Sequence, residues 1–87
     1  MIKRKVTLLN ELGLHARPAS KFVKLASRFK SQIYVIKDGV EVNGKSIMGL
    51  MMLAAESGSI LTLKVFGEDE EKAINELEKL IKTKFEE

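Results

Sequence analysis

The chain of 87 residues contains no cysteine, and it has only one proline and one histidine. Without cysteine it can form neither disulfides nor thiolate metal sites, so a domain of this size must rely on packing for its stability. The lack of cysteine also suits a reducing compartment. No apolar run approaches the roughly 20 residues that cross a bilayer, and the first five residues lack the apolar stretch of a signal peptide. We therefore expect a cytoplasmic protein that does not associate with a membrane and binds no metal or cofactor.

The chain also lacks a large excess of charge of one sign. The 15 basic and 12 acidic residues give a net charge of +3, which does not by itself indicate a nucleic-acid partner. A nucleic-acid-binding α+β domain remains the alternative, but such a domain exposes aromatic residues on its sheet, and the chain offers only Tyr34 and Phe66 for base stacking. The apolar share of 45% and the absence of repeats or linkers predict a single domain over residues 1–87.

The spacing of apolar residues predicts seven elements. Residues 6–9, 33–36, 40–42 and 60–66 have the composition of strands, and Asp38-Gly39 predicts a hairpin turn between the second and third of them. Residues 15–29, 47–54 and 68–85 have the three- and four-residue spacing of amphipathic helices. The resulting order, βαββαβα, predicts an α+β open-faced β-sandwich in which a four-stranded antiparallel sheet carries three helices on one face.

Each predicted helix has an apolar stripe that we expect to face the sheet. In the last helix, acidic residues at the start and lysines near the end also complement the helix dipole. The expected core residues are Ala19, Phe22, Val23, Ala26 and Phe29 in the first helix, Ile47, Leu50, Met51 and Ala54 in the second, Ala73, Ile74, Leu77, Ile81 and Phe85 in the third, and Leu61, Leu63 and Val65 in the last strand.

The only histidine, His15, lies at the predicted start of the first helix, in the stretch GLHARP (residues 13–18). Pro18 fits only a first helical turn, so Ala16 and Pro18 would belong to a helix N-terminus whose unpaired N–H groups bind anions. The guanidinium of Arg17 can pair two phosphoryl oxygens. The same positive field favours a neutral imidazole, whose nitrogen lone pair can act as a nucleophile. These neighbours argue against the alternative, a lone surface histidine without a role.

Two further groups of residues are candidates for docking a partner. Basic residues recur at helical spacing after His15, and they form either a solvated face or a docking surface for an acidic partner. Ile47 and Met48 are candidates for an apolar contact surface, because Met48 falls outside the buried spacing that Met51 shares. The basic stripe consists of Arg17, Lys21, Lys24 and Arg28.

Ser46 lies at the predicted start of the second helix, where its hydroxyl can simply cap backbone N–H groups. Phosphorylation would place a dianion at the same helix N-terminus, where the dipole favours it, so a regulatory role is physically allowed. Residues 39–46 also match the nucleotide-binding pattern G-x-x-x-x-G-K-[ST]. We reject a nucleotide site, because residues 40–42 alternate as a strand, Gly39 belongs to the hairpin turn, and the chain is too short for a nucleotide-hydrolysing domain.

Two stretches together resemble the HPr family, the histidine-containing phosphocarriers of the bacterial sugar phosphotransferase system. GLHARPA (residues 13–19) is similar to the active-site motif of the family, and KSIMG (residues 45–49) is similar to its regulatory-serine motif at the expected distance. The resemblance covers essentially the whole chain. Met52 and the stretch AAE (residues 54–56) depart from the family pattern but lie in neither motif. The presence of His15 separates the chain from a catabolite-repression relative of HPr, which lacks the histidine and only regulates.

The resemblance implies a monomeric phosphocarrier, and not an enzyme. His15 would accept a phosphoryl group on Nδ1 from phosphoenolpyruvate through enzyme I and pass it to enzyme IIA domains in sugar transport, while Arg17 steadies the group. Ser46 would be the target of HPr kinase/phosphorylase, and the phosphoserine form would bind a regulator of carbon catabolite control. A carrier in a purely regulatory chain would share His15 and Arg17, and this alternative stays open.

Overall fold

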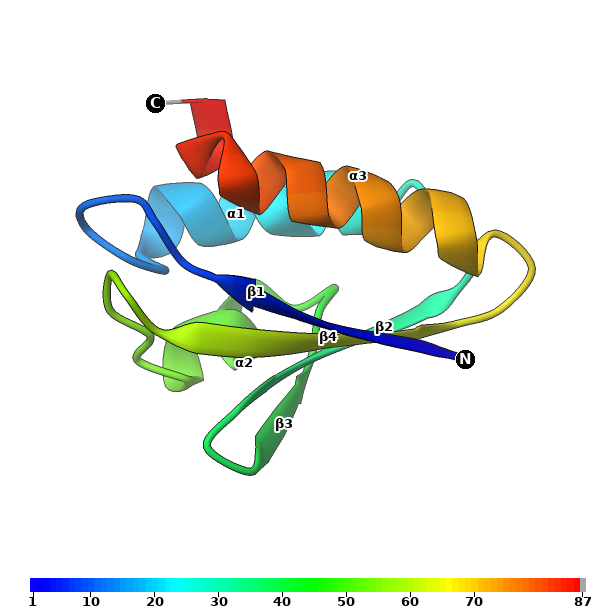
Figure 1. Cartoon of the computed structure of the whole chain (residues 1–87), viewed down its shortest axis with the longest axis horizontal. Helices are drawn as coiled ribbons and strands as arrows, with labels where there is room; N and C mark the ends of the chain where they lie inside the picture. Colours follow the sequence, from blue (N-terminus) through cyan, green and yellow to red (C-terminus); the bar gives the residue numbers. More distant parts are fainter. Residues whose placement is uncertain (87) are drawn as a thin grey trace.

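The computed structural model describes residues 1–86, and these residues form four strands, three α-helices and one short 3₁₀ helix. The strands make one antiparallel sheet in the order β1-β4-β2-β3. Helices α1 and α3 lie side by side over one face of the sheet, and α2 packs against α1 and beside β3 (Figure 1). The elements are β1 (Ile2–Thr7), α1 (Ala16–Ala26), β2 (Gln32–Lys37), β3 (Val40–Asn43), α2 (Ile47–Met52), β4 (Ile60–Phe66), α3 (Glu70–Lys82) and η1 (Lys84–Glu86). The predicted fold class and element order are confirmed.

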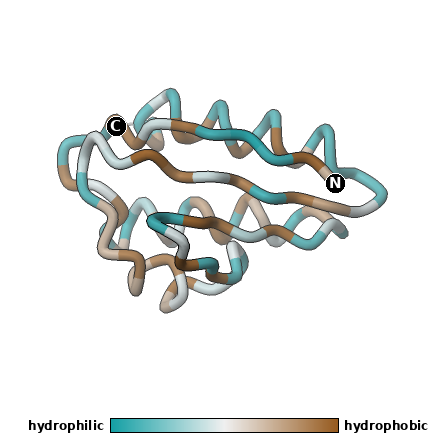
Figure 2. The backbone as a smooth tube through the Cα atoms, turned by 60° about the horizontal axis from the view of Figure 1, so that its bottom comes forward, coloured by the Kyte–Doolittle hydropathy of each residue, from teal (hydrophilic) through white to brown (hydrophobic). Residues whose placement is uncertain are grey.

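The core lies between the sheet and the helices, and β4 runs through its centre. Leu61, Leu63 and Val65 are almost completely buried, as their alternation predicts. They stand opposite apolar residues of both neighbouring strands, with Leu63 paired to Val35 and Leu61 to Val6. The alternation of hydrophobic and hydrophilic residues can be followed along the strand traces in Figure 2. One face of the sheet is therefore buried under α1 and α3, and the other remains open.

The first strand extends over Ile2–Thr7, so the predicted range of residues 6–9 is wrong. The basic run at residues 3–5 hid the alternation from sequence reasoning. Lys3 and Lys5 face solvent, whereas Arg4 lies on the helix side and is only half-buried. Its guanidinium donates to Asn75 at 2.7 Å and pairs with Glu78 at 3.0 Å, and both partners belong to α3. A charged residue can thus occupy an inward position of an edge strand because a carboxylate on the covering helix pairs with it.

The second helix is shorter than predicted. α2 ends at Met52, and Leu50 is its one fully buried residue within the described part of the chain. Met51 is 45% exposed, and Ala54 lies outside the helix with a φ of 49°, so the expected core positions of both residues are wrong. The chain turns after Met52 and buries Leu53 and Ala55 instead. Ile47 is also exposed.

Helices α1 and α3 end earlier than predicted, although the expected core residues near their ends are still buried. α1 stops at Ala26, and Phe29 reaches the core from the following turn, whereas Val23 is only partly buried. α3 covers Glu70–Lys82, and Phe85 is fully buried from η1, where residues 84–86 all have positive φ. The apolar spacing therefore predicted which residues are buried more accurately than it predicted where the helices end.

Asp69 joins the start of α3 to the segment that follows α1. Its carboxylate accepts hydrogen bonds from the Ser31 hydroxyl and from the backbone N–H groups of Lys30 and Ser31, at 2.5 to 3.0 Å. These bonds, the one from the Ser31 hydroxyl above all, lower the pKa of Asp69 from 3.8 to about 2. Gly67 packs closely against Ser31, since a Cβ atom at position 67 would lie 2.7 Å from the Ser31 Cα. The hydrogen bonds of Asp69 and this close contact hold α1 and α3 relative to each other at this end of the molecule.

We predict that Asp69→Asn lowers the melting temperature by several degrees at neutral pH, because an amide cannot accept all three hydrogen bonds. Folding depresses the pKa of Asp69, so its contribution is present above about pH 3.8 and is lost as the pH falls through about 2. The difference between wild type and variant should therefore shrink over that range in thermal unfolding followed by circular dichroism.

Asp38→Asn is the matched control for this experiment. Asp38 lies in the hairpin turn with its side chain 86% exposed, and its one ion pair, to Lys37, is 3.4 Å long. Removal of such an exposed pair should change the melting temperature less than Asp69→Asn does, because exposed ion pairs contribute little to stability. An Asp69→Asn deficit that stays the same from neutral pH down to pH 2 would contradict the assigned role of the carboxylate.

Candidate functional site

His15 is the N-cap residue of α1, as its position before Pro18 predicted. Its backbone is extended, with φ −75° and ψ −178°, and its carbonyl oxygen accepts the first helical hydrogen bond, from Ala19 at 2.9 Å. The imidazole is exposed and does not cap the helix. The ring is therefore accessible to another macromolecule from outside.

The first turn of α1 presents unused donors next to this imidazole. Pro18 has no N–H group, so the backbone donors of the turn are those of Ala16 and Arg17. Neither donates to another group among residues 1–86, and the turn contains no acidic side chain that would offset the dipole. The Arg17 side chain is exposed and takes part in no ion pair or side-chain hydrogen bond within these residues. An anion in front of α1 would meet two N–H groups and one free guanidinium.

The loop before His15 is held by the buried side chain of Asn10 and by a backbone contact with the segment after α2. The amide nitrogen of Asn10, whose side chain is fully buried, donates to the Gly13 carbonyl oxygen at 2.6 Å, and the Leu14 N–H donates to the Ala55 carbonyl oxygen at 2.9 Å. Gly13 has a φ of 72°, and a Cβ atom there would overlap the Ala55 carbonyl oxygen and lie 2.9 Å from the Glu56 Cα. Only glycine allows this close approach. Sequence reasoning identified Gly13 as part of a motif but could not supply this reason.

A hollow lies beside His15, where the backbone of residues 13 and 14 meets that of residues 55 and 56, and its volume is about 270 Å³. Met51 from α2 and Glu56 from the following loop line it together with the imidazole. Sequence reasoning missed both residues, because they lie far from His15 in the chain and neither belongs to a motif. Arg17 does not line the hollow. The full lining is Leu14, His15, Met51, Ala54, Ala55 and Glu56.

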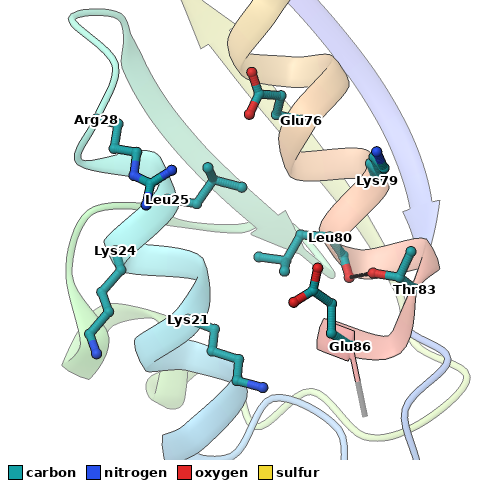
Figure 3. A pocket seen from close by; sticks show the side chains of 9 residues that line it. All are labelled: Lys21, Lys24, Leu25, Arg28, Glu76, Lys79, Leu80, Thr83 and Glu86. Atoms are coloured by element: carbon teal, nitrogen blue, oxygen red, sulfur yellow. Dashed lines mark hydrogen bonds between the residues drawn. The ribbon is translucent and has the colours of Figure 1, made fainter.

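Lys21 and Lys24, the predicted docking lysines, line a different and larger cavity of about 690 Å³ between α1 and α3 (Figure 3). The Lys21 ammonium donates to the Phe85 carbonyl oxygen at 2.9 Å and so fixes η1 against α1. Arg28 also lines this cavity, whereas Arg17 does not. The predicted basic stripe is therefore divided, with Arg17 beside the His15 end and the rest along the groove. The other lining residues are Leu25, Glu76, Lys79, Leu80, Thr83 and Glu86.

Ser46 is the N-cap residue of α2, and the predicted capping role is confirmed. Its hydroxyl accepts a hydrogen bond from the Gly49 N–H at 3.0 Å. The next two residues, Ile47 and Met48, are 40% and 77% exposed. Ser46 and the predicted apolar contact residues thus form the start of one helix, on the side of the molecule where α2 meets α1 (Figure 1).

The nucleotide-site pattern at residues 39–46 does not form a phosphate-binding loop. Residues 40–43 are strand β3, and Gly39 lies in the hairpin turn with a φ of 80°. The rejection made from the sequence is confirmed. Tyr34, one of the two aromatics considered for base stacking, is half-buried, and the Lys64 ammonium lies 5.2 Å from its ring centroid. Its ring is therefore not an open stacking surface.

Within residues 1–86, no three side chains of the metal-ligating types come together to form a candidate metal site. In the same part of the chain, none of the helices combines the length and the apolar character that a membrane crossing requires.

Comparison with known proteins gives consistent matches. A family profile described as the PTS HPr component phosphorylation site matches residues 2–83. Phosphocarrier protein HPr of Neisseria meningitidis serogroup B is 51% identical over 81 residues, which cover 93% of this chain and 91% of the relative. HPr-like protein Crh of Bacillus subtilis is 49% identical over 77 residues, which cover 88% of this chain and 91% of the relative.

Solved structures share the fold. HPr-C-His from Thermoanaerobacter tengcongensis is similar with a TM-score of 0.97 at 49% identity, and the match covers 100% of this chain and 98% of that one. An HPr dimer from the same organism is similar with a lower TM-score of 0.80, also at 49% identity and with full coverage of both chains.

Proposed function

The chain belongs to the HPr family of phosphotransferase-system phosphocarriers, and on this premise we propose that His15 takes a phosphoryl group from phospho-enzyme I and passes it to enzyme IIA domains of sugar transport systems. One observation carries the proposal. The exposed imidazole stands at the N-cap of α1, in front of two backbone N–H groups that have no acceptor within residues 1–86.

The proposed transfer needs little from the carrier beyond this geometry. A lone pair of the neutral imidazole attacks the phosphorus, a nitrogen–phosphorus bond forms at His15, and the bond to the donor breaks with its electron pair left on the donor. The N–H groups of Ala16 and Arg17 and the Arg17 guanidinium then stabilise the phosphoryl oxygens, as positioned donors do in phosphoryl transfer. Passing the group to the acceptor reverses the same steps, so the protein is a carrier and not an enzyme.

We propose that the protein works in the cytoplasm, and the surface around the site offers residues that could dock protein partners. The His15 imidazole is exposed beside a small hollow of about 270 Å³, so a partner protein that carries the phosphoryl group can reach it directly. Ile47 and Met48 offer exposed apolar area, and Lys21 and Lys24 offer positive charge for steering an acidic partner. We assign these four residues to partner docking.

We predict that His15→Ala abolishes phosphoryl acceptance while the fold stays intact, because the side chain is exposed and caps nothing. Arg17→Ala should retain acceptance but slow it by about tenfold or more, since a charge-assisted contact to the phosphoryl group is lost. The measurement is intact-mass spectrometry after incubation with phosphoenolpyruvate, Mg²⁺ and enzyme I. Wild type should gain one acid-labile phosphoryl group.

Lys5→Ala controls for the loss of a positive charge in this experiment, because Lys5 is exposed on the opposite, open face of the sheet. It should accept the phosphoryl group at the wild-type rate. Absence of any phosphoryl gain in wild type, with an enzyme I proved active on another carrier, would refute the proposed function. If the His15→Ala protein proved unfolded, His15→Gln would test the site, because its amide cannot accept the phosphoryl group.

We further propose that Ser46 is phosphorylated by an HPr kinase/phosphorylase and that the product binds a regulator of carbon catabolite control. The supporting observation is that Ser46 is a half-buried N-cap whose hydroxyl already meets the Gly49 N–H. A phosphate dianion there would replace one neutral acceptor at the positive end of α2. It would also place negative charge beside Ile47 and Met48, where a partner is proposed to dock.

Ser46→Asp should therefore slow phosphoryl transfer from enzyme I to His15, by about tenfold, through like-charge repulsion of an acidic partner. Steady-state kinetics at low and high salt test the explanation, because added salt should reduce the deficit. Thr7→Asp is the comparison variant, because Thr7 is exposed on β1 and belongs to neither the site nor the proposed docking surface, and it should be phosphorylated at the wild-type rate. An equal rate for Ser46→Asp and wild type at low salt would remove the regulatory proposal.

We propose that the working form is a monomer. The covering of one sheet face by the chain's own α1 and α3 supports this, because the core is complete within one copy. A dimer has been described for HPr of Thermoanaerobacter tengcongensis, so the two states have to be separated by measurement. Sedimentation equilibrium at micromolar concentration should give the monomer mass, and a dimer mass under these conditions would refute the proposal.

A further inference from the structure

Three of the four methionines of the chain lie on one short helix and are open to solvent. Met48, Met51 and Met52 of α2 are 77%, 45% and 78% exposed. The helix is held instead by Leu50, which is fully buried, and by Leu53 just after it. The chain has no cysteine, so these thioethers are the accessible sulfur atoms of the protein, together with that of Met1.

These methionines lie beside the phosphoryl site. Met51 lines the same hollow as the His15 imidazole. Met48 follows Ile47, and both belong to the surface proposed to dock partners. Met52 adds a further exposed apolar side chain to the same helix. A protein that reaches His15 across α2 would cover these thioethers.

We propose that Met48, Met51 and Met52 form an oxidation-sensitive modification site, at which a peroxide converts the thioethers to sulfoxides and thereby blocks phosphoryl transfer through His15. In each reaction a sulfur lone pair attacks one peroxide oxygen and the O–O bond breaks. The sulfur gains one oxygen and is oxidised by two electrons, while the second oxygen leaves with both protons as water. The proposal rests on the proposed carrier function.

The expected effect follows from the change in polarity. A sulfoxide is polar and accepts hydrogen bonds, so an oxidised methionine loses the favourable burial of its apolar surface against a partner. The fold should survive, because the oxidised side chains are outside the core and Leu50 and Leu53 still anchor α2. Methionine sulfoxide is also reducible by dedicated reductases, which makes the modification reversible.

The test compares wild type with the Met48→Leu/Met51→Leu/Met52→Leu variant, each before and after treatment with hydrogen peroxide. Peptide mapping locates the sulfoxides, and phosphoryl acceptance from enzyme I gives the rate. Wild type should gain sulfoxides on α2 and lose about tenfold or more in rate, and methionine sulfoxide reductase should restore it. The leucine variant keeps Met1. Its rate of phosphoryl acceptance after peroxide treatment should stay close to the rate of the same variant before treatment.

A second pair of variants avoids peroxide altogether. The Met48→Gln/Met51→Gln/Met52→Gln variant imitates the polarity of the sulfoxides and should slow transfer by a similar factor. Ile60→Gln makes the same kind of change at a 61% exposed apolar residue of β4 and should leave the rate unaltered. Circular dichroism verifies that each variant is folded.

The outcomes separate the two proposals. Untreated wild type that accepts no phosphoryl group refutes the carrier function, and the methionine proposal falls with it. Normal acceptance before treatment, with an unchanged rate after the α2 methionines have been oxidised, overturns the methionine proposal alone. An equal loss of rate in the leucine variant overturns it as well, because the sensitive group must then lie elsewhere.

Discussion

The close approach of the Gly13-Leu14 backbone to Ala55 and Glu56 fixes the site on which the rest of the function depends. The Leu14 N–H bonds to the Ala55 carbonyl oxygen, and the missing side chain of Gly13 lets the two segments touch. This contact sets where α1 begins relative to α2, and hence which side chains surround the imidazole. Main-chain contacts hold this part of the surface in place without using any exposed side chain.

The part of the fold that could be predicted is the part whose periodicity is local and regular. Leu61, Leu63 and Val65 alternate without interruption, and the apolar positions of α3 repeat over three turns, so both elements followed from the sequence. β1 did not, because Arg4 occupies an inward position, where it contacts Asn75 and Glu78 of α3 far along the chain. The end of α2 depends on a turn that buries Leu53 and Ala55, and neighbouring residues carry no signal for it.

The same distinction applies to the site. His15, its place at a helix start and the capping hydroxyl of Ser46 were predictable, because Pro18 and the residues around Ser46 act within a few positions of the chain. The role of Gly13 and the presence of Met51 and Glu56 beside the imidazole were not, because they arise from a contact between distant segments. The separation of Arg17 from the other basic residues also required the structure, since helical spacing places all four on one stripe but only Lys21, Lys24 and Arg28 line the groove between α1 and α3.

Pro18 has a consequence for the energetics of the carrier. A transferred phosphoryl group has three oxygens, but the first turn offers the N–H groups of Ala16 and Arg17 and lacks the third that another residue at position 18 would supply. Each N–H bond to a charged oxygen contributes on the order of 1.5–3 kcal/mol. With one of them missing, the helix would hold a phosphoryl group less firmly than a full anion-binding turn. This would suit the proposed carrier, because a group bound too tightly would remain on it and not reach the acceptor.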